Sequence, residues 1–267
     1  MTHRIGSFFA DAGWLQQALS DMGYRELAAT VVDSDCWPSL APKFKSWPED
    51  VKVALREALL NYGCAEDHAS YLIHIDGGDD AVFAALRESG DNAELVNYCR
   101  CRGRNEAIED AIIKNDLNAD NSAGAVRFCV CVARSDAMRQ SVLDVGDADS
   151  IFDYINDVND SADADGVDPD MKQALIDSGS YYNCFRYCRR YGDDDAMCAV
   201  VIKGDDPALL LSYCRYIADR EDVWRRLIEC GDLFRLRLYV SGVRSDNADV
   251  NAAITKLEGS TPEPDNA

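Results

Sequence analysis

Two C-x-C pairs are the first candidates for metal-binding chemistry: Cys99 with Cys101, and Cys129 with Cys131. Residues two apart on a helix point about 200° away from each other, so such a pair cannot readily hold one ion. Zinc sites more often use C-x2-C or helical i, i+4 pairs. We therefore interpret these cysteines as core residues or exposed thiols and not as metal ligands.

A second candidate metal site does have the helical i, i+4 spacing. It consists of Cys64 and His68, followed by His74 and Asp76. A structural zinc ion takes four ligands, and nothing in the sequence completes this set. The segment is more typical of a capped helix start, and we predict no metal and no cofactor.

The segment SADADGVDPDMK partly resembles a helical calcium-binding loop, because Asp163 and Asp165 precede Gly166. That loop needs Asp at its first place and Glu at its twelfth. Ser161 and Lys172 occupy those places here. Two interpretations stay open, a weak calcium site and a solvated acidic linker.

Catalytic motifs are missing from the sequence. There is no GxSxG, no phosphate-binding glycine loop, no HExxH, and no nucleophile with a matched base. We predict that the chain is not an enzyme.

The Arg-aromatic segment FRYCRRY at 185–191 has the composition of a patch that binds single-stranded nucleic acid. Its periodic Tyr and Cys are better explained as core residues, so we predict no direct nucleic-acid binding.

The elements that must position these residues are short helices in a repeating pattern, each ended by a glycine or asparagine. A left-handed residue of this kind is a common helix terminator. The terminators are Gly23, Gly63, Gly90, Asn115, Gly146, Gly179, Gly204 and Gly231. Apolar residues stand four and eight places before each one and share one helix face. These pairs are Leu15/Leu19, Leu55/Leu59, Val82/Leu86, Ala107/Ala111, Met138/Val142, Met171/Leu175, Ala196/Val200 and Val223/Leu227.

A second helix follows each terminator and carries a recurring aromatic residue. The series is Tyr71, Tyr98, Phe128, Tyr154, Tyr187, Tyr213 and Tyr239, and Leu, Ile, Val or Cys stands directly after each. The basal period is about 26 residues, or two helices of about 11–12 residues, which are marginal alone and must stack on their neighbours. We predict an all-α fold, an α-solenoid of about eight two-helix repeats. The pattern resembles HEAT-type two-helix arrays in the broad sense, with repeats of HEAT-like or ankyrin-like length.

Departures from the repeat divide the chain. We expect a helix pair and a Trp/Pro-rich capping loop over 1–48, and a first half of the array over 49–156. An acidic insertion follows over 157–170 and is a hinge or the weak calcium site. The second half and a capping helix cover 171–258, and 259–267 is expected to be a disordered tail.

The net charge of -21 is the strongest compositional signal. Such a surface repels free nucleic acid and anionic membranes and favours basic partners. Eight repeats would span about 80 Å, so the charge averages roughly one per 4 Å, near the density of a single nucleic-acid strand. Acid at the starts of first helices and Arg at the ends of second helices predict a mixed Arg/Asp ladder where successive repeats meet.

Aspartates that follow the terminators predict a row of carboxylates on the opposite edge, where they can also cap the second helices. This expected partner-binding edge comprises Asp91, Asp116, Asp147, Asp205, Asp206 and Asp232. The chain shows neither a signal peptide nor an apolar run of the ~18 residues that a membrane span needs. Eleven Cys, an odd number, indicate a reducing, cytoplasmic setting.

We therefore expect a non-catalytic acidic binding protein that docks on a basic protein. In the sharpest form of this hypothesis the partner is a nucleic-acid-binding protein. This chain would then be an inhibitor that mimics DNA or RNA and occupies the partner's nucleic-acid-binding site, as in viral counter-defence. The alternative is an intracellular scaffold or adaptor that uses apolar and Tyr/Arg surface, its acidity being generic. The oligomeric state and the binding face are not encoded in any motif that we recognise.

Overall fold

The fold is all-α throughout the part of the chain that the computed structural model describes, residues 41–259 apart from 43, 48 and 159–165. No strand occurs in these ranges, and the predicted fold class is confirmed. The first helices of the repeats, here called A helices, are α4 (Glu49–Tyr62), α6 (Asp80–Glu88), α8 (Glu106–Ala119), α10 (Asp136–Val145), α12 (Pro169–Asp177), α14 (Asp195–Lys203), α16 (Glu221–Cys230) and α18 (Ala248–Gly259). The second helices, or B helices, are α5 (Ala65–His74), α7 (Asn92–Arg102), α9 (Ala123–Cys131), α11 (Ala148–Asp157), α13 (Tyr181–Tyr191), α15 (Pro207–Tyr216) and α17 (Leu233–Gly242).

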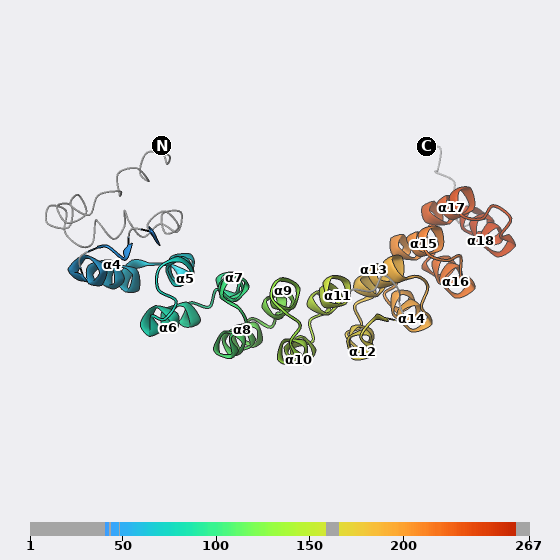
Figure 1. The fold of residues 1–267 in the computed structure, drawn as a ribbon. Helices are drawn as coiled ribbons and strands as arrows, with labels where there is room; N and C mark the ends of the chain where they lie inside the picture. Colours follow the sequence, from blue (N-terminus) through green and yellow to red (C-terminus); the bar gives the residue numbers. More distant parts are fainter. Residues whose placement is uncertain (1–40, 43, 48, 159–165, 260–267) are drawn as a thin grey trace, which may run out of the picture. The chain divides into compact units, whose positions relative to one another are not determined.

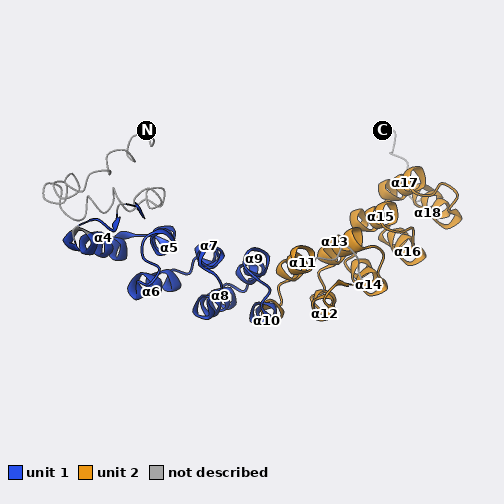
Figure 2. Ribbon diagram, in the orientation of Figure 1, with its two compact units in different colours: residues 1–141 blue, residues 142–267 orange. Residues whose placement is uncertain are grey.

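The chain divides into two compact units, Met1–Ser141 and Val142–Ala267 (Figure 2). Within each unit the A helices pack against successive A helices and the B helices against successive B helices, which gives two rows (Figure 1). This is the layering of a helical-repeat array. The helix pair predicted within 1–48 lies in residues 1–40, which are outside the described part of the chain, so the total of eight repeats stays a prediction. Residues 159–165 of the insertion and 260–267 of the tail are also outside it.

The predicted core stripes are buried in most repeats. Leu59, Val82, Leu86, Met138, Val142, Met171, Leu175, Val223 and Leu227 all have an exposed fraction of 0%. The B-helix aromatics are buried as well, from Phe128, Tyr213 and Tyr239 at 0% to Tyr98 at 7%. The stacking interfaces therefore bury the stripes that the spacing indicated.

Two repeats correct the predicted register. In α8 the helix continues past Asn115 to Ala119, and Asp120 takes the left-handed conformation (φ 49°). In α14 the left-handed residue is Asp205 (φ 57°), while Gly204 keeps a right-handed backbone. Asp120 and Asp205 are the two residues other than glycine with positive φ in the described chain. An aspartate tolerates this conformation because its short polar side chain bonds locally.

The core positions shift accordingly. Ile108 and Ile112 are fully buried in α8, where Ala107 and Ala111 were predicted and are half-buried. Met197 and Val201 are buried in α14 at 0% and 1%; of the predicted pair, Val200 is buried at 8% and Ala196 is exposed. In α8 the buried Ile108 and Ile112 stand twelve and eight residues before the left-handed Asp120. In α14 the buried Met197 and Val201 stand eight and four residues before the left-handed Asp205.

The loop before α4 contributes to the core of unit 1. Trp47, from the second Trp-Pro pair, is 5% exposed. Phe44 lies between this ring and Tyr71, with ring centroids 5.6 Å and 6.2 Å away. The described end of the predicted capping loop thus packs on the first B helix.

Candidate binding surfaces

Four of the six predicted edge aspartates are helix N-caps. The Asp91 carboxylate accepts from the amides of Ala93 and Glu94 at 3.0 and 3.2 Å, which caps α7. Asp147, Asp206 and Asp232 cap α11, α15 and α17 in the same way. The predicted capping role is confirmed for these residues. In each case one carboxylate oxygen accepts the capping hydrogen bond.

Asp116 does not lie on an exposed edge. It is within α8 and only 3% exposed. One of its oxygens accepts from Asn92 Nδ2 at 2.6 Å, and the other accepts from the Ala125 amide at 2.7 Å. The carboxylate thus caps α9 from the preceding helix. A Cβ at Gly124 would lie 2.7 Å from Asp116 Oδ1, so this approach requires glycine.

Asp205 and Asp232 are paired with arginines of unit 2. Arg226 Nη2 lies 2.5 Å from Asp205 Oδ2, and Arg235 bonds to the second oxygen of Asp232. The hydrogen bond from Arg226 lowers the pKa of Asp205, and the Arg235 amide lowers the pKa of Asp232. Basic side chains that the sequence analysis did not place here therefore balance two of the six aspartates predicted for this edge.

An acidic surface of unit 2 lies instead on the B helix α11. Asp149, Asp153 and Asp157 recur at every fourth residue, so they share one face of the helix, and we call them the acidic stripe. The Asp149 side chain is 80% exposed, the Asp153 side chain 49%, and Asp157 is exposed. The D-x3-D-x3-D spacing would have identified this stripe from the sequence, had the acidic residues been searched for helical periodicity as the apolar ones were.

The acidic stripe is only partly neutralised. Arg186 of α13 lies 3.8 Å from an Asp149 oxygen and 3.5 Å from an Asp153 oxygen. Desolvation raises the pKa of Asp153, and the charges of Asp157 and Asp149 add to this against the opposing charge of Arg186. The neighbouring like charges therefore repel one another in the folded helix.

The predicted Arg/Asp ladder between repeats is present only in part. Arg104, Arg220 and Arg244, which follow B helices, form ion pairs, but the arginines in the last turns of α13 and α15 have no carboxylate partner among the described residues. Arg220 bonds to Asp195 at 2.6 Å, to Asp222 at 2.9 Å and to Asp193 at 3.1 Å. In unit 1, Arg104 Nη2 donates to the buried Glu109 at 3.0 Å and to Ser135 at 3.2 Å. These charged side chains at the junctions therefore pair with one another within the array.

The exposed large apolar side chains of unit 2 gather on three B helices. They are Tyr181, Tyr182, Tyr216, Phe234 and Leu238 of α13, α15 and α17. The same helices contain six arginines and no acidic residue. The sequence analysis explained the Arg-aromatic segments by their buried Tyr and Cys. That holds for Tyr187, Cys188, Tyr213 and Cys214, but the exposed half of each helix is a distinct surface.

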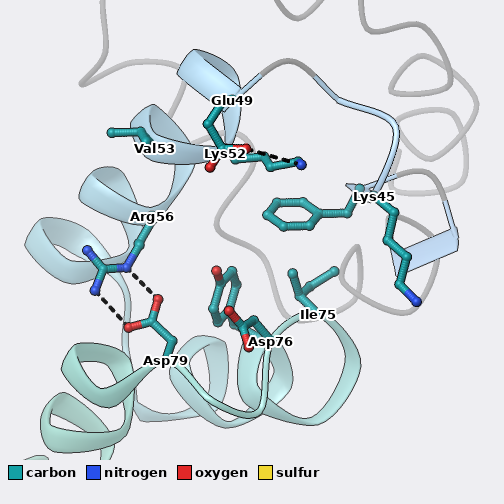
Figure 3. Close-up of a pocket in the computed structure, with 10 residues that line it drawn as sticks. Lys45, Glu49, Lys52, Val53, Arg56, Ile75, Asp76 and Asp79 are labelled. Carbon is teal, nitrogen blue, oxygen red and sulfur yellow. Dashed lines mark hydrogen bonds and ion pairs between the residues drawn. The ribbon is translucent and has the colours of Figure 1, made fainter.

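A pocket of about 410 Å³ lies in unit 1 between α4, α5 and the adjoining loops (Figure 3). Arg56 and Asp79 form an ion pair on its wall, with Arg56 Nη2 2.8 Å from Asp79 Oδ1. Burial opposes ionisation of Asp79, but the hydrogen bonds from Arg56 and two amides hold the pKa of this carboxyl below its usual value. Burial raises the pKa of Tyr71 to about 12, so its phenol stays protonated at neutral pH and supplies no base.

The candidate metal ligands do not converge. Cys99 and Cys129 are buried while Cys101 and Cys131 are exposed, as the spacing by two predicted. His68 is buried, and its Nε2 lies 3.1 Å from the Leu59 carbonyl oxygen. Among the described residues no group of three or more His, Cys, Asp or Glu is placed to hold a metal ion. Most of the calcium-like segment lies outside these residues.

Burial also controls the thiols. It raises the pKa of Cys99, Cys188 and Cys198 to about 11 and that of Cys184 and Cys214 to about 12. These side chains therefore remain neutral thiols and act as small apolar residues.

No described helix combines the length and the apolar character that crossing a bilayer requires. No family model matches the chain, and neither a curated protein nor a solved structure matches it.

Proposed function

We propose that this protein is a non-catalytic helical-repeat binding protein whose acidic surface docks on a basic protein. The observation that carries the proposal is the acidic stripe of α11, in a chain with a net charge of -21. Helical repeats expose long surfaces suited to gripping other macromolecules. Asp147 and Asp206, which cap α11 and α15, add carboxylates within the same unit, and Asp91 adds one in unit 1.

Contacts with α13 account for only part of the stripe: Asn183 Nδ2 donates to Asp149 Oδ1 at 2.9 Å, and Arg186 lies near Asp149 and Asp153. Like charges at i, i+4 destabilise a helix by roughly 0.2–0.5 kcal/mol per pair. The three aspartates make two such pairs, and Arg186 compensates for two of the three charges at 3.5 Å or more. A surface that opposes folding in this way is more simply explained by recognition of a cationic partner.

The sharpest form of the proposal is an inhibitor that occupies the nucleic-acid-binding surface of another protein, in a reducing cytoplasm and in the manner of a viral counter-defence protein. Four residues of helix rise place neighbouring carboxylates about 6 Å apart. A nucleic-acid strand carries a phosphate for every 3.4 Å or so of rise. The stripe is therefore a sparse mimic, and long-range attraction would contribute more than a point-by-point copy of phosphate positions.

The test is capture of basic proteins on the immobilised full chain, followed by elution with duplex DNA. Retained proteins are expected to be nucleic-acid-binding proteins that DNA displaces. The variant with Asp149→Asn, Asp153→Asn and Asp157→Asn should retain roughly tenfold less. A matched control with Asp50→Asn, Asp110→Asn and Asp120→Asn loses the same charge from exposed sites in unit 1 and should retain normal amounts. Retention that neither DNA nor the stripe variant reduces would refute the proposal.

A second candidate function is a scaffold or adaptor that binds through apolar and Tyr/Arg surface. The exposed side chains of α13, α15 and α17 favour it specifically, because Tyr216 and Phe234 are 62% and 67% exposed. In that case the Asp→Asn changes along α11 would leave partner binding intact.

A further inference from the structure

The B helices α13, α15 and α17 are positively charged, opposite in sign to the chain as a whole. Their sequences hold six arginines and no Asp or Glu, although the chain as a whole carries a net charge of -21. The three helices lie in one row within unit 2 (Figure 1). If acidic residues were spread over the surface without a function, these three helices would be expected to carry some of them.

Arginines of this row surround one exposed ring. The Cζ atoms of Arg189 and Arg215 lie 6.0 Å and 5.4 Å from the centroid of Tyr216, which is 62% exposed. Arg190 lies against the neighbouring ring of Tyr191, with its Cζ 5.6 Å from the centroid. We call Arg189, Arg190, Arg215 and Tyr216 the arginine–tyrosine cluster. Guanidinium groups at this distance from a ring are held by cation–π attraction.

The cluster also lies against α17, at Gly242. A Cβ added at Gly242 would lie 3.8 Å from Arg215 Cζ, so the guanidinium rests against this helix. The cluster therefore joins α13, α15 and α17 into one continuous surface.

The three arginines of the cluster have no carboxylate partner among the described residues. Arg186 and Arg237, on the same helices, are paired with Asp149 and Glu258. Stacked guanidinium groups keep their N–H donors at the ring edge, where two of them can bind one carboxylate. The N–H donors of these three arginines are therefore suited to bind a carboxylate of another molecule.

Apolar side chains lie on the same row. Phe234 and Leu238 of α17 are 67% and 39% exposed, and Tyr182 of α13 is 55% exposed. They offer contacts for apolar or aromatic anchors, which are the residues that dominate binding energy in protein interfaces.

We propose that the arginine–tyrosine cluster and Phe234 bind an acidic peptide segment of another protein, with carboxylates on the arginines and an apolar or aromatic anchor beside Phe234. A polyanion such as single-stranded nucleic acid fits less well, because the net charge of -21 repels it in proportion to its charge. A second copy of the chain would bring the same charge with it. The arginine–tyrosine cluster and Phe234 share no residue with the acidic stripe, so either proposal can fail alone.

The test is selection of random 12-residue peptides displayed on phage against the full chain. Peptides that combine Asp or Glu with aromatic or aliphatic residues should be enriched at least roughly tenfold, and the best one should bind in fluorescence anisotropy. The double variant Arg189→Ala/Arg215→Ala is expected to weaken this binding about tenfold or more. Tyr216→Ala, which keeps both arginines, should weaken it by about threefold to tenfold.

The matched control is Arg225→Ala. Arg225 also lies over an aromatic ring, with its Cζ 5.7 Å from the centroid of the buried Trp224. It belongs to the A helix α16 and pairs with Glu221 at 2.5 Å. Its loss should leave peptide binding unchanged. The proposal is overturned if no acidic peptide is enriched, or if the double variant binds it as tightly. Tighter binding of a dT20 oligonucleotide that the double variant loses would assign the surface to nucleic acid instead.

Discussion

Hydroxyl groups of the buried B-helix tyrosines make different contacts at equivalent positions. Tyr239 donates to Asp219 at 2.7 Å and accepts from Asn247 Nδ2 at 3.2 Å. Tyr213 donates to Asp193 in the equivalent junction. The Tyr187 hydroxyl, which is buried, has no hydrogen-bond partner among the described residues. All three tyrosines bury their ring, but only Tyr213 and Tyr239 form the hydrogen bond to an aspartate.

We expect Tyr239→Phe to lower the free energy of unfolding by roughly 1–2 kcal/mol, because a hydrogen bond to a charged carboxylate is lost. The matched change Tyr187→Phe removes an unsatisfied buried hydroxyl and should be neutral or slightly stabilising. Urea unfolding followed by circular dichroism measures both. Equal losses in the two variants would contradict the assignment of the bond.

Two aspartates should make opposite contributions to the pH dependence of stability. Burial disfavours the charged form of Asp194, but hydrogen bonds from Lys172 and two amides outweigh this and lower its pKa. Its stabilisation is present above the unfolded-state value near 3.9 and is lost as the pH falls through the folded-state pKa. Desolvation and the neighbouring aspartates raise the pKa of Asp153. Its contribution is present below the unfolded-state value and is lost as the pH rises through the folded-state pKa.

Asp194→Asn should therefore destabilise the protein at pH 7 and by less near pH 3. Asp153→Asn should stabilise it at pH 7 by a few tenths of a kcal/mol, as expected for an exposed like-charge helix pair, and should have no effect near pH 3. Thermal unfolding at a series of pH values tests both. If the two variants shift the curve in the same direction at pH 7, the electrostatic account of α11 is wrong.

At the scale of elements, the start of α9 depends on a residue of the helix before it. Asp116 is 3% exposed and accepts from Asn92, Gly124 and Ala125. We expect Asp116→Ala to cost roughly 2–4 kcal/mol, because buried donors lose their acceptor. Asp91→Ala removes an exposed cap of α7 and should cost only about 1 kcal/mol. Urea unfolding that ranks the two variants equally would contradict the buried cap.

The same elements show what the sequence could predict. Hydrophobic spacing identified the A and B helices and their buried faces, because a helix must bury its apolar stripe whatever its partner. It misplaced the end of α8, since it required Asn115 to end a helix that continues to Asp120. In α14 the helix does end before Gly204, but the left-handed residue is Asp205. Local preference alone does not reveal that a polar side chain will accept this backbone.

Candidate surfaces were less predictable than helices. Four of the six turn aspartates were correctly assigned as caps. Arg226 could not be placed beside Asp205 without the packing of successive helices, whereas Arg235 stands three residues after Asp232 and could have been. The acidic stripe was present in the sequence as a period of four. The arginine–tyrosine cluster was not, because Arg189 and Tyr216 belong to different repeats.

At the scale of the whole molecule, the charge is sorted by helix. In unit 2 the stripe of α11 is acidic, whereas the exposed faces of α13, α15 and α17 are basic and aromatic. Because stacked repeats contact mainly their neighbours, each surface can change without unfolding the others. This separation makes the two binding proposals testable in a single folded chain.

The most direct measurement is the salt dependence of affinity for a basic protein recovered by capture, compared between the wild type and the Asp149→Asn/Asp153→Asn/Asp157→Asn variant. We predict that the slope of log Kd against log salt concentration falls by about two in the variant, because fewer carboxylates pair with the partner. The control at Asp50, Asp110 and Asp120 should keep the wild-type slope. Identical slopes for the wild type and the stripe variant would contradict the claim that this protein binds through its acidic surface.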